Sequence, residues 1–207
     1  MPRTAPEMPA RLAQAAFELF GERGIDEVTI DEIAARLGVT KGSFYTHFQS
    51  KREIVLAACN HYYRGYQSSI HMELAALADP LARLRRMLEF SVRHCILNDR
   101  SRLFTTELFA LSLKDAEVRR GWAQFFDTVR ETYVGLVMAA QNAGSLPEGD
   151  PRPAVDMMLD AIEGVKMRAS FESELAARGQ QRQLVDGLMR IVRTSLGVEP
   201  GLATTEA

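Results

Sequence analysis

TIDEIAARLGVTKGSFYTHFQSKRE, residues 29–53, is the stretch that decides the fold of this chain. A helix is predicted to begin after Thr29, because the Thr29 hydroxyl can accept from the backbone N–H of Glu32 while the Glu32 carboxylate can reach back to the N–H of Thr29. Ser50 and Glu53 repeat this capping-box pattern near the far end of the stretch. The pattern therefore predicts a second helix start at Ser50.

The residues between these caps predict two short helices joined by a tight turn. Apolar residues recur at i, i+3, i+4 and i+7, namely Ile30, Ile33, Ala34 and Leu37. Gly38 follows, where a residue without Cβ most easily adopts the left-handed conformation that ends a helix, and Thr40 is placed to cap the next helix. Phe44 and Phe48, four residues apart, give that second helix an inward face. The result is a helix, a sharp turn and a helix.

The second helix leaves a polar outward face in a locally basic environment. That face consists of Lys41, Gly42, Ser43, Tyr45, Thr46 and His47. Residues 33–52 include four basic residues (Arg36, Lys41, Lys51 and Arg52) and no acidic one, although the formal net charge of the chain is -2. Such a face attracts phosphate, and the hydroxyls of Thr40, Ser43 and Tyr45 supply donors that fix register on a duplex. A merely solvated helix face is the alternative, but the turn and both caps favour a DNA-binding helix-turn-helix.

The pattern T-x-x-x-I-A-x-x-x-G-V-T-K-G-S-F-Y-T-H-F-x-S-K, from Thr29 to Lys51, resembles the DNA-binding domain of TetR-family transcriptional regulators, and the likeness continues upstream to Ala13–Phe20 and Gly24. The resemblance implies that the helix beginning at Thr40 is the recognition helix. It implies that Lys41, Gly42, Tyr45 and Thr46 face bases and that Thr29, Ser43, His47 and Lys51 lie near phosphates. Thr29 and Thr40 are expected to cap their helices in addition to any phosphate contact. By chemistry alone, a lysine such as Lys41 favours guanine O6 and N7.

Composition bounds the rest of the chain. Its 207 residues are 46% hydrophobic and 25% charged, as in ordinary globular proteins of one or two domains. Cys59 and Cys95 show no C-x-x-C spacing, so we expect buried or half-buried free thiols rather than a disulfide framework or a metal site. Apolar runs such as Leu136 to Ala140 are too short to span a bilayer, and the N-terminus lacks the apolar core of a secretion signal. We therefore expect a cytoplasmic protein with no cofactor and no metal.

Periodicity and caps predict an all-α chain. Residues 1–50 are predicted to form a three-helix DNA-binding domain with a helix-turn-helix, residues 51–199 a larger helical domain for ligand binding and dimerisation, and residues 200–207 a disordered tail. The predicted landmarks are a loose arm at Met1–Pro9, a first helix closing near Gly21–Gly24, a long fourth helix from Ser50 past Tyr66, a helix opening at Asp79-Pro80, breaks at Asn98–Asp99 and Lys114–Asp115, and helices at Ala116–Asn142, from Asp150-Pro151 through Phe171, and at Gln181–Leu196.

The larger domain carries aromatic and methionine side chains typical of an adaptable apolar pocket. The candidate pocket residues are His94, Phe104, Phe109, Trp122, Phe125, Phe126, Tyr133 and Met167, with His94 as the polar group. The same residues are equally compatible with plain core packing. If the pocket exists, it would take a small, largely apolar effector.

The last two predicted helices each present an apolar face, which favours a homodimer built from four helices. The candidate interface residues are Val155, Leu159, Ile162, Val165, Leu184, Leu188, Ile191 and Val192. TetR-like proteins dimerise through this part of the chain, and a dimer would set two recognition helices roughly 34 to 36 Å apart on a near-palindrome. The stretch Phe104–Ala169 is also similar to regulators akin to the betaine-response repressor.

Three functions follow as hypotheses. The chain contains no G-x-G-x-x-G, P-loop, H-E-x-x-H or G-x-S-x-G motif, so an enzyme is not expected. The favoured reading is a ligand-responsive repressor that binds an operator in double-stranded DNA. A constitutive DNA-binding regulator without an inducer is the nearest alternative. An α-helical enzyme or carrier with an incidental helix-turn-helix is the alternative from a different class.

Overall fold

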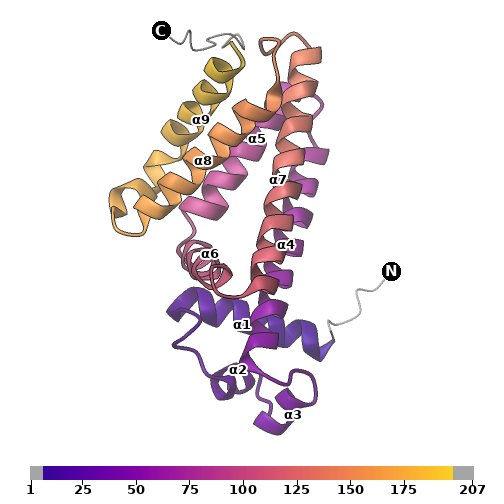
Figure 1. The fold of residues 1–207 in the computed structure, drawn as a ribbon, viewed down its shortest axis with the longest axis vertical. Coiled ribbons are helices and arrows are strands. Elements are labelled where there is room, and N and C mark those ends of the chain that lie inside the picture. Colours follow the sequence, from indigo (N-terminus) through magenta and orange to yellow (C-terminus); the bar gives the residue numbers. More distant parts are fainter. Residues whose placement is uncertain (1–6, 198–207) are drawn as a thin grey trace, which may run out of the picture. The chain divides into compact units, whose positions relative to one another are not determined.

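The computed structural model describes residues 7–197, and all of its regular elements in that range are helical (Figure 1). The predicted all-α class is thereby confirmed. The tail expected at residues 200–207, and residues 1–6 of the expected N-terminal arm, lie outside the described residues. Within the described range, no helix has the length and apolar character needed to cross a membrane.

The chain divides into two compact units that interleave along the sequence. Within the described residues, unit 1 comprises the chain up to Ser69 together with Asn98–Phe125, and unit 2 comprises Ile70–Leu97 together with the chain from Phe126 onward. Two long helices, α4 (Lys51–Ala75) and α7 (Ala116–Asn142), contribute residues to both units. These units reflect compactness, whereas the predicted domains 1–50 and 51–199 reflect function, so the functional division stays a prediction.

Unit 1 contains α1 (Met8–Arg23), α2 (Ile30–Arg36), α3 (Lys41–Tyr45), the first part of α4, α6 (Asp99–Ser112) and the start of α7. Its core includes fully buried side chains on α1, α2, α3 and α6, among them Leu12, Phe20, Ile33, Phe44 and Phe104. Helix α1 packs along both α2 and α6. A Cβ at Gly21 would lie 2.8 Å from the carbonyl oxygen of Arg100, so this close approach of α1 to α6 requires glycine.

Polar contacts reinforce the packing of α6 on α1. The Glu107 carboxylate accepts a hydrogen bond from the backbone N–H of Ile25, just beyond the end of α1. The guanidinium of Arg100 lies 2.7 Å from the carboxylate of Glu22. Helix α1 and the segment that follows it are therefore bound to a helix about eighty residues later in the chain, a feature that local sequence patterns do not predict.

Unit 2 contains the end of α4, α5 (Pro80–Ser91), a π-helical turn (Val92–Ile96), most of α7, α8 (Pro151–Ala169), two short 3₁₀ turns (Ser173–Ala176 and Arg178–Gln180) and α9 (Gln181–Leu196). Helices α8 and α9 pack against each other. Tyr133 is fully buried, and its hydroxyl lies 2.7 Å from Ser91 Oγ and donates to the carbonyl of Met87 at 3.2 Å. The buried phenol is thus satisfied.

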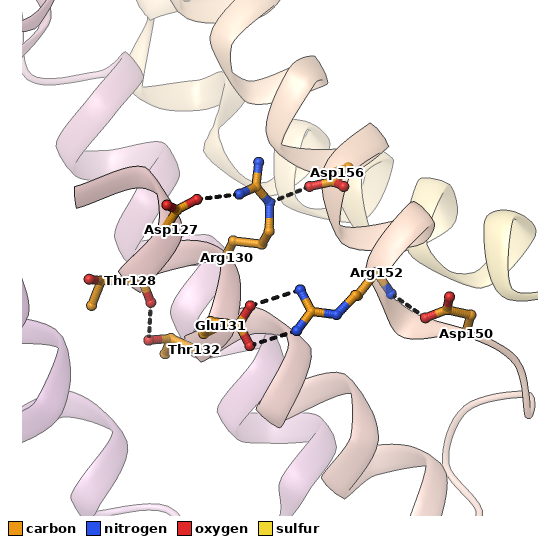
Figure 2. A network of polar contacts seen from close by, with 8 residues as sticks. All are labelled: Asp127, Thr128, Arg130, Glu131, Thr132, Asp150, Arg152 and Asp156. Carbon is orange, nitrogen blue, oxygen red and sulfur yellow. Dashed lines mark hydrogen bonds and ion pairs between the residues drawn. The ribbon is translucent and has the colours of Figure 1, made fainter. Parts of the chain in front are cut away.

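Ion pairs bridge α7 and α8 within unit 2 (Figure 2). Arg130 lies 2.6 Å from Asp156 of α8 and 2.6 Å from Asp127 of its own helix. Arg152 of α8 binds both oxygens of Glu131, at 2.8 and 3.1 Å. Partly exposed pairs of this kind add about 0 to 1 kcal/mol each, so the network defines the register of α8 on α7 more than it stabilises the fold.

Most helix boundaries agree with the sequence. Asp79, Asn98 and Asp150 each cap a helix with their side chains, and α9 has the predicted bounds. The predicted loose arm is wrong at Met8 and Pro9, which begin α1, because proline fits the first turn of a helix. The predicted extension of α8 to Phe171 is also wrong, since the helix ends at Ala169. The π-helical turn was not predicted.

Candidate nucleic-acid interface

The helix-turn-helix of α2 and α3 has the predicted caps. Thr29 Oγ1 accepts from Glu32 N at 3.3 Å, and the Glu32 carboxylate accepts from Thr29 N at 2.7 Å. Gly38 has φ +67, the left-handed conformation that the turn requires. Thr40 Oγ1 accepts from Ser43 N at 3.1 Å and so caps α3. The position of α3 is therefore fixed at both its turn and its start.

The second predicted capping box is only half correct. Ser50 Oγ accepts from Glu53 N at 3.2 Å, as predicted, and α4 begins at Lys51. The Glu53 carboxylate, however, accepts from the N–H of Gln49 at 2.7 Å rather than from that of Ser50. The carboxylate satisfies an N–H group one residue further upstream, and the helix start is unaffected.

The inward face of α3 consists of aromatic side chains. Phe44 is fully buried, and Phe48 lies half-buried with its ring centroid 5.7 Å from that of Phe44. Ala34 of α2 is buried as well, and α2 packs directly on α3. This small core holds α3 while the opposite side of the helix stays free of packing.

The residues predicted to contact DNA all lie in unit 1, and most are exposed. Thr29, Thr40, Lys41, Gly42, Tyr45, Thr46 and His47 are exposed, whereas Ser43 and Lys51 are half-buried. Tyr45, a large aromatic side chain, is 40% exposed. The Thr46 hydroxyl donates to the carbonyl of Ser43 at 2.7 Å. Its oxygen can still accept a hydrogen bond from another group. Together, the predicted DNA-contacting residues present hydroxyls, an imidazole and two lysines.

Both lysines that are predicted to contact DNA have partners in the free protein. Lys41 Nζ lies 3.0 Å from the Asp31 carboxylate, and this hydrogen bond raises the pKa of Lys41 above its ordinary value. Lys51 Nζ donates to the carbonyl of Asp26 at 3.0 Å. A carbonyl carries no net charge, so the positive charge of Lys51 stays available to phosphate. The charge of Lys41, in contrast, is balanced by the Asp31 carboxylate.

The two arginines of the basic stretch serve the fold. Arg36 binds Glu22 of α1 at 3.1 Å. Arg52 binds Asp115 at 2.6 Å and Glu117 at 2.8 Å, and this pairing raises the pKa of Arg52 and lowers that of Asp115. The expected local excess of positive charge is therefore reduced, because folding brings acids from distant positions to residues 33–52.

The predicted pocket residues are distributed over both units. Phe104 and Phe125 are buried and Trp122 is half-buried in unit 1, whereas unit 2 contains buried Tyr133 and half-buried His94 and Phe126. Phe109 of unit 1 and Met167 of unit 2 are each 43% exposed. A pocket lined by these residues stays a prediction.

His94 lies in the π-helical turn that interrupts the end of α5. Its ring stacks on Phe90 with centroids 4.5 Å apart. Burial and the nearby Arg93 lower the pKa of His94, whereas Glu73 raises it. Because π turns are frequent at functional sites, this local geometry favours His94 as a candidate functional residue.

Sequence reasoning passed over an aromatic cluster on α4. Tyr62 and Tyr66 are buried, and Tyr66 packs edge-on against Phe125 with centroids 5.3 Å apart. Tyr63 stacks on Phe125 at 4.6 Å. The spacing of Tyr62 and Tyr66 at i and i+4 was the available signal.

The predicted dimer residues fall into two sets. Val155, Leu159, Ile162, Leu188 and Val192 are buried within the chain itself, whereas Val165, Leu184 and Ile191 are half-buried. Other apolar side chains of this region are exposed, namely Met157 at 58% and Phe171 at 72%. The exposed part of this region therefore differs from the set chosen by apolar periodicity.

A capped helix-turn-helix on a small helical core, with a polar outward face on its second helix, defines a DNA-binding protein of the helix-turn-helix class. Residues 12–58 match the family model described as bacterial regulatory proteins, tetR family. This stretch of the chain is therefore a DNA-binding domain of the tetR type.

Similarity to known proteins extends over most of the chain. The transcriptional regulator TtgR of Pseudomonas putida is 29% identical over 175 residues, 79% of this chain and 80% of that protein. The transcriptional regulator BetI of Yersinia pestis is 25% identical over 166 residues, 79% of this chain and 81% of its own length. The crystal structure of a transcriptional regulator from Saccharomonospora viridis in complex with choline has a TM-score of 0.80 at 21% identity, and covers 88% of this chain and 95% of that one. That last similarity concerns the fold.

Proposed function

We propose that this regulator is a homodimeric repressor that binds a near-palindromic operator and is released by a small, largely apolar effector. The observation that carries the proposal is the outward face of α3, which is exposed and polar while its opposite face is anchored by Phe44. Such a face fits the major groove, where base edges are distinguishable. Its place of action would be the cytoplasm.

Each residue predicted to contact DNA has a role in this proposal. Lys41, Gly42, Tyr45 and Thr46 would face base edges, and Gly42 would let the backbone approach them closely. Thr29, Thr40, Ser43, His47 and Lys51 would contact phosphates and fix register. Lys41 would exchange the Asp31 carboxylate for an acceptor on DNA, guanine O6 or N7 being the best match.

The homodimer would use the exposed faces of α8 and α9. Met157, Gly164 and Phe171 lie seven residues apart, on or just beyond α8, and all three are exposed. Leu184 and Ile191 repeat the seven-residue spacing on α9 and are half-buried. This spacing is typical of helices that pack at a shallow angle, and glycine lets two helices approach closely. Exposed apolar side chains in register therefore support a second copy of the chain as the partner.

Effector control is supported by the aromatic content of the larger domain and by the structural relative that binds choline. Helix α4 begins directly after the helix-turn-helix and contributes to both units. An effector that shifts α4 would change the spacing of the two recognition helices. Moving the regulator from almost fully competent to almost fully incompetent needs about 5.5 kcal/mol of differential affinity.

Selection of the purified protein on random DNA duplexes at near-physiological salt tests DNA recognition. Wild-type protein is expected to enrich one near-palindrome, and Tyr45→Ala is expected to lose it. His47→Ala and His71→Ala form a matched pair, because both histidines are exposed but only His47 lies on the proposed face. Enrichment by His71→Ala but not by His47→Ala supports the assignment. Failure of every form to enrich any sequence would favour the enzyme or carrier alternative.

Reciprocal titration tests effector control. Choline, the molecule held by the structural relative, is the first probe, followed by a panel of small apolar compounds. If the effector weakens operator binding, the operator must weaken effector binding by the same factor. Compounds that bind without any mutual effect would favour the constitutive regulator.

A further inference from the structure

Unit 1 contains a cavity of about 280 Å³ between the first half of α4 and the start of α7. Its lining is graded by burial. The buried or half-buried lining is largely apolar and consists of Leu56, Cys59, Tyr63, Val118 and Gly121. The exposed lining is polar and consists of Asn60, Glu117, Arg120 and Gln124. The site thus has an apolar floor and a polar rim, and none of the predicted pocket residues lines it.

The floor is shaped for a flat apolar group. The Tyr63 ring is held by stacking on Phe125, with centroids 4.6 Å apart. Gly121 adds no side chain beside this ring, and a Cβ there would lie 3.8 Å from Tyr63 Cε2. The hydroxyl of Tyr63 is buried and has no hydrogen-bond partner in the part of the chain that the structure describes. An aromatic ring of fixed orientation therefore adjoins the cavity.

The charge at the rim favours an anion. Glu117 is bound by Arg52 at 2.8 Å, and the neighbouring Asp115 is bound by the same guanidinium at 2.6 Å. Arg120, in contrast, forms no ion pair with any residue between 7 and 197. The cavity also lies beside the N-terminal turns of α7, where the helix dipole favours negative charge. One cation of the rim is consequently available for a ligand.

We propose that this cavity is a binding site for a small aromatic carboxylate. The ring lies on the apolar floor beside Tyr63, and the carboxylate is bound by Arg120 at the rim. A guanidinium binds a carboxylate through two parallel hydrogen bonds, which gives the site its selectivity for acids over neutral compounds of the same shape. The site is independent of the proposed DNA interface, because no residue of that interface lines it.

Benzoate titration, read by fluorescence, tests the site. The chain has one tryptophan, Trp122, which lies next to the floor with its ring centroid 6.2 Å from that of Tyr63. Wild-type protein is expected to show a saturable change of emission with benzoate, and calorimetry gives the affinity. Arg120→Gln is expected to weaken binding about tenfold or more, since a charge-assisted bond is lost. Arg119→Gln is the matched control, because Arg119 donates to the Ser112 carbonyl and does not line the cavity.

A second pair of variants tests the location. Gly121→Ala is expected to bind benzoate as wild type does, because its methyl group would meet Tyr63 at ordinary contact distance. Gly121→Leu is expected to abolish binding by filling the cavity, with thermal melting as the check that it folds. Benzyl alcohol, which lacks the charge, should bind at least tenfold more weakly than benzoate. Equal loss in Arg119→Gln and Arg120→Gln, unchanged binding in Gly121→Leu, or no saturable binding by wild type would overturn the proposal and leave the DNA-binding function untouched.

Discussion

Replacing Lys51 by glutamine should reduce the salt dependence of operator binding. Lys51 begins α4, and its ammonium group is held by the uncharged carbonyl of Asp26 at 3.0 Å, so the position of the charge is fixed while the charge itself is not neutralised. On DNA, each phosphate neutralised by a lysine adds about 0.9 to the slope of log K against log salt concentration. A homodimer presents two copies of Lys51, so Lys51→Gln should make the slope smaller by about 1.8.

Fluorescence anisotropy with a labelled operator, at salt concentrations from low to above physiological, measures this slope. Arg52→Gln is the matched control, because Arg52 is the adjacent cation but is occupied by Asp115 and Glu117. Its slope should equal that of wild type, although its melting temperature should fall. A wild-type slope for Lys51→Gln, or an equal reduction for Arg52→Gln, would refute the assignment of Lys51 to phosphate.

Three further predictions concern the same unit. Asp31→Asn should strengthen operator binding several-fold in low-salt anisotropy titrations, because Lys41 no longer has to break its ion pair with the Asp31 carboxylate before it binds DNA. Weaker binding would show that Asp31 positions the lysine. Acid melting curves should show stability lost between about pH 4.5 and pH 2, because Arg23 and Thr29 lower the pKa of Glu32 to about 2. A carboxylate with a lowered folded pKa stabilises the fold above its unfolded pKa, and this contribution is lost as the pH falls through the folded pKa. Glu32→Gln should flatten that part of the curve. Phe44→Ala should cost about 3 to 5 kcal/mol in urea unfolding, whereas Tyr45→Ala should cost less than about 1 kcal/mol, since only the first side chain is buried; similar losses for both would contradict the described packing.

Local signals in the sequence were sufficient to predict the helix-turn-helix. The caps at Thr29 and Thr40 and the glycine turn at Gly38 depend on neighbours within four residues, and all three have the predicted geometry. The bounds of α9 were predicted for the same reason. Signals that act over one helical turn can be read from one sequence without knowing the fold.

Contacts between distant residues were not predictable in this way. Nothing near Arg52 indicates that Asp115 and Glu117 will bind it. Apolar periodicity on α8 and α9 likewise marks every residue suited to burial, but it does not distinguish burial within the chain from burial against a partner. Val155 near the start of α8 is buried within the chain, whereas Phe171 just beyond its end is exposed.

The packing of α1 on α6 also constrains how regulators of this kind can be recombined. A chimaera joined after residue 50 would combine the helix-turn-helix of one protein with the later helices of another. It would leave Phe104 behind, although the Phe104 ring stacks with that of Phe20, with centroids 6.4 Å apart. It would also separate Gly21 from the Arg100 backbone, whose close approach requires a glycine at position 21. A transplanted helix-turn-helix should therefore be transferred together with residues 98–125 of its own chain, or the recipient's equivalent helix should be given a matching surface.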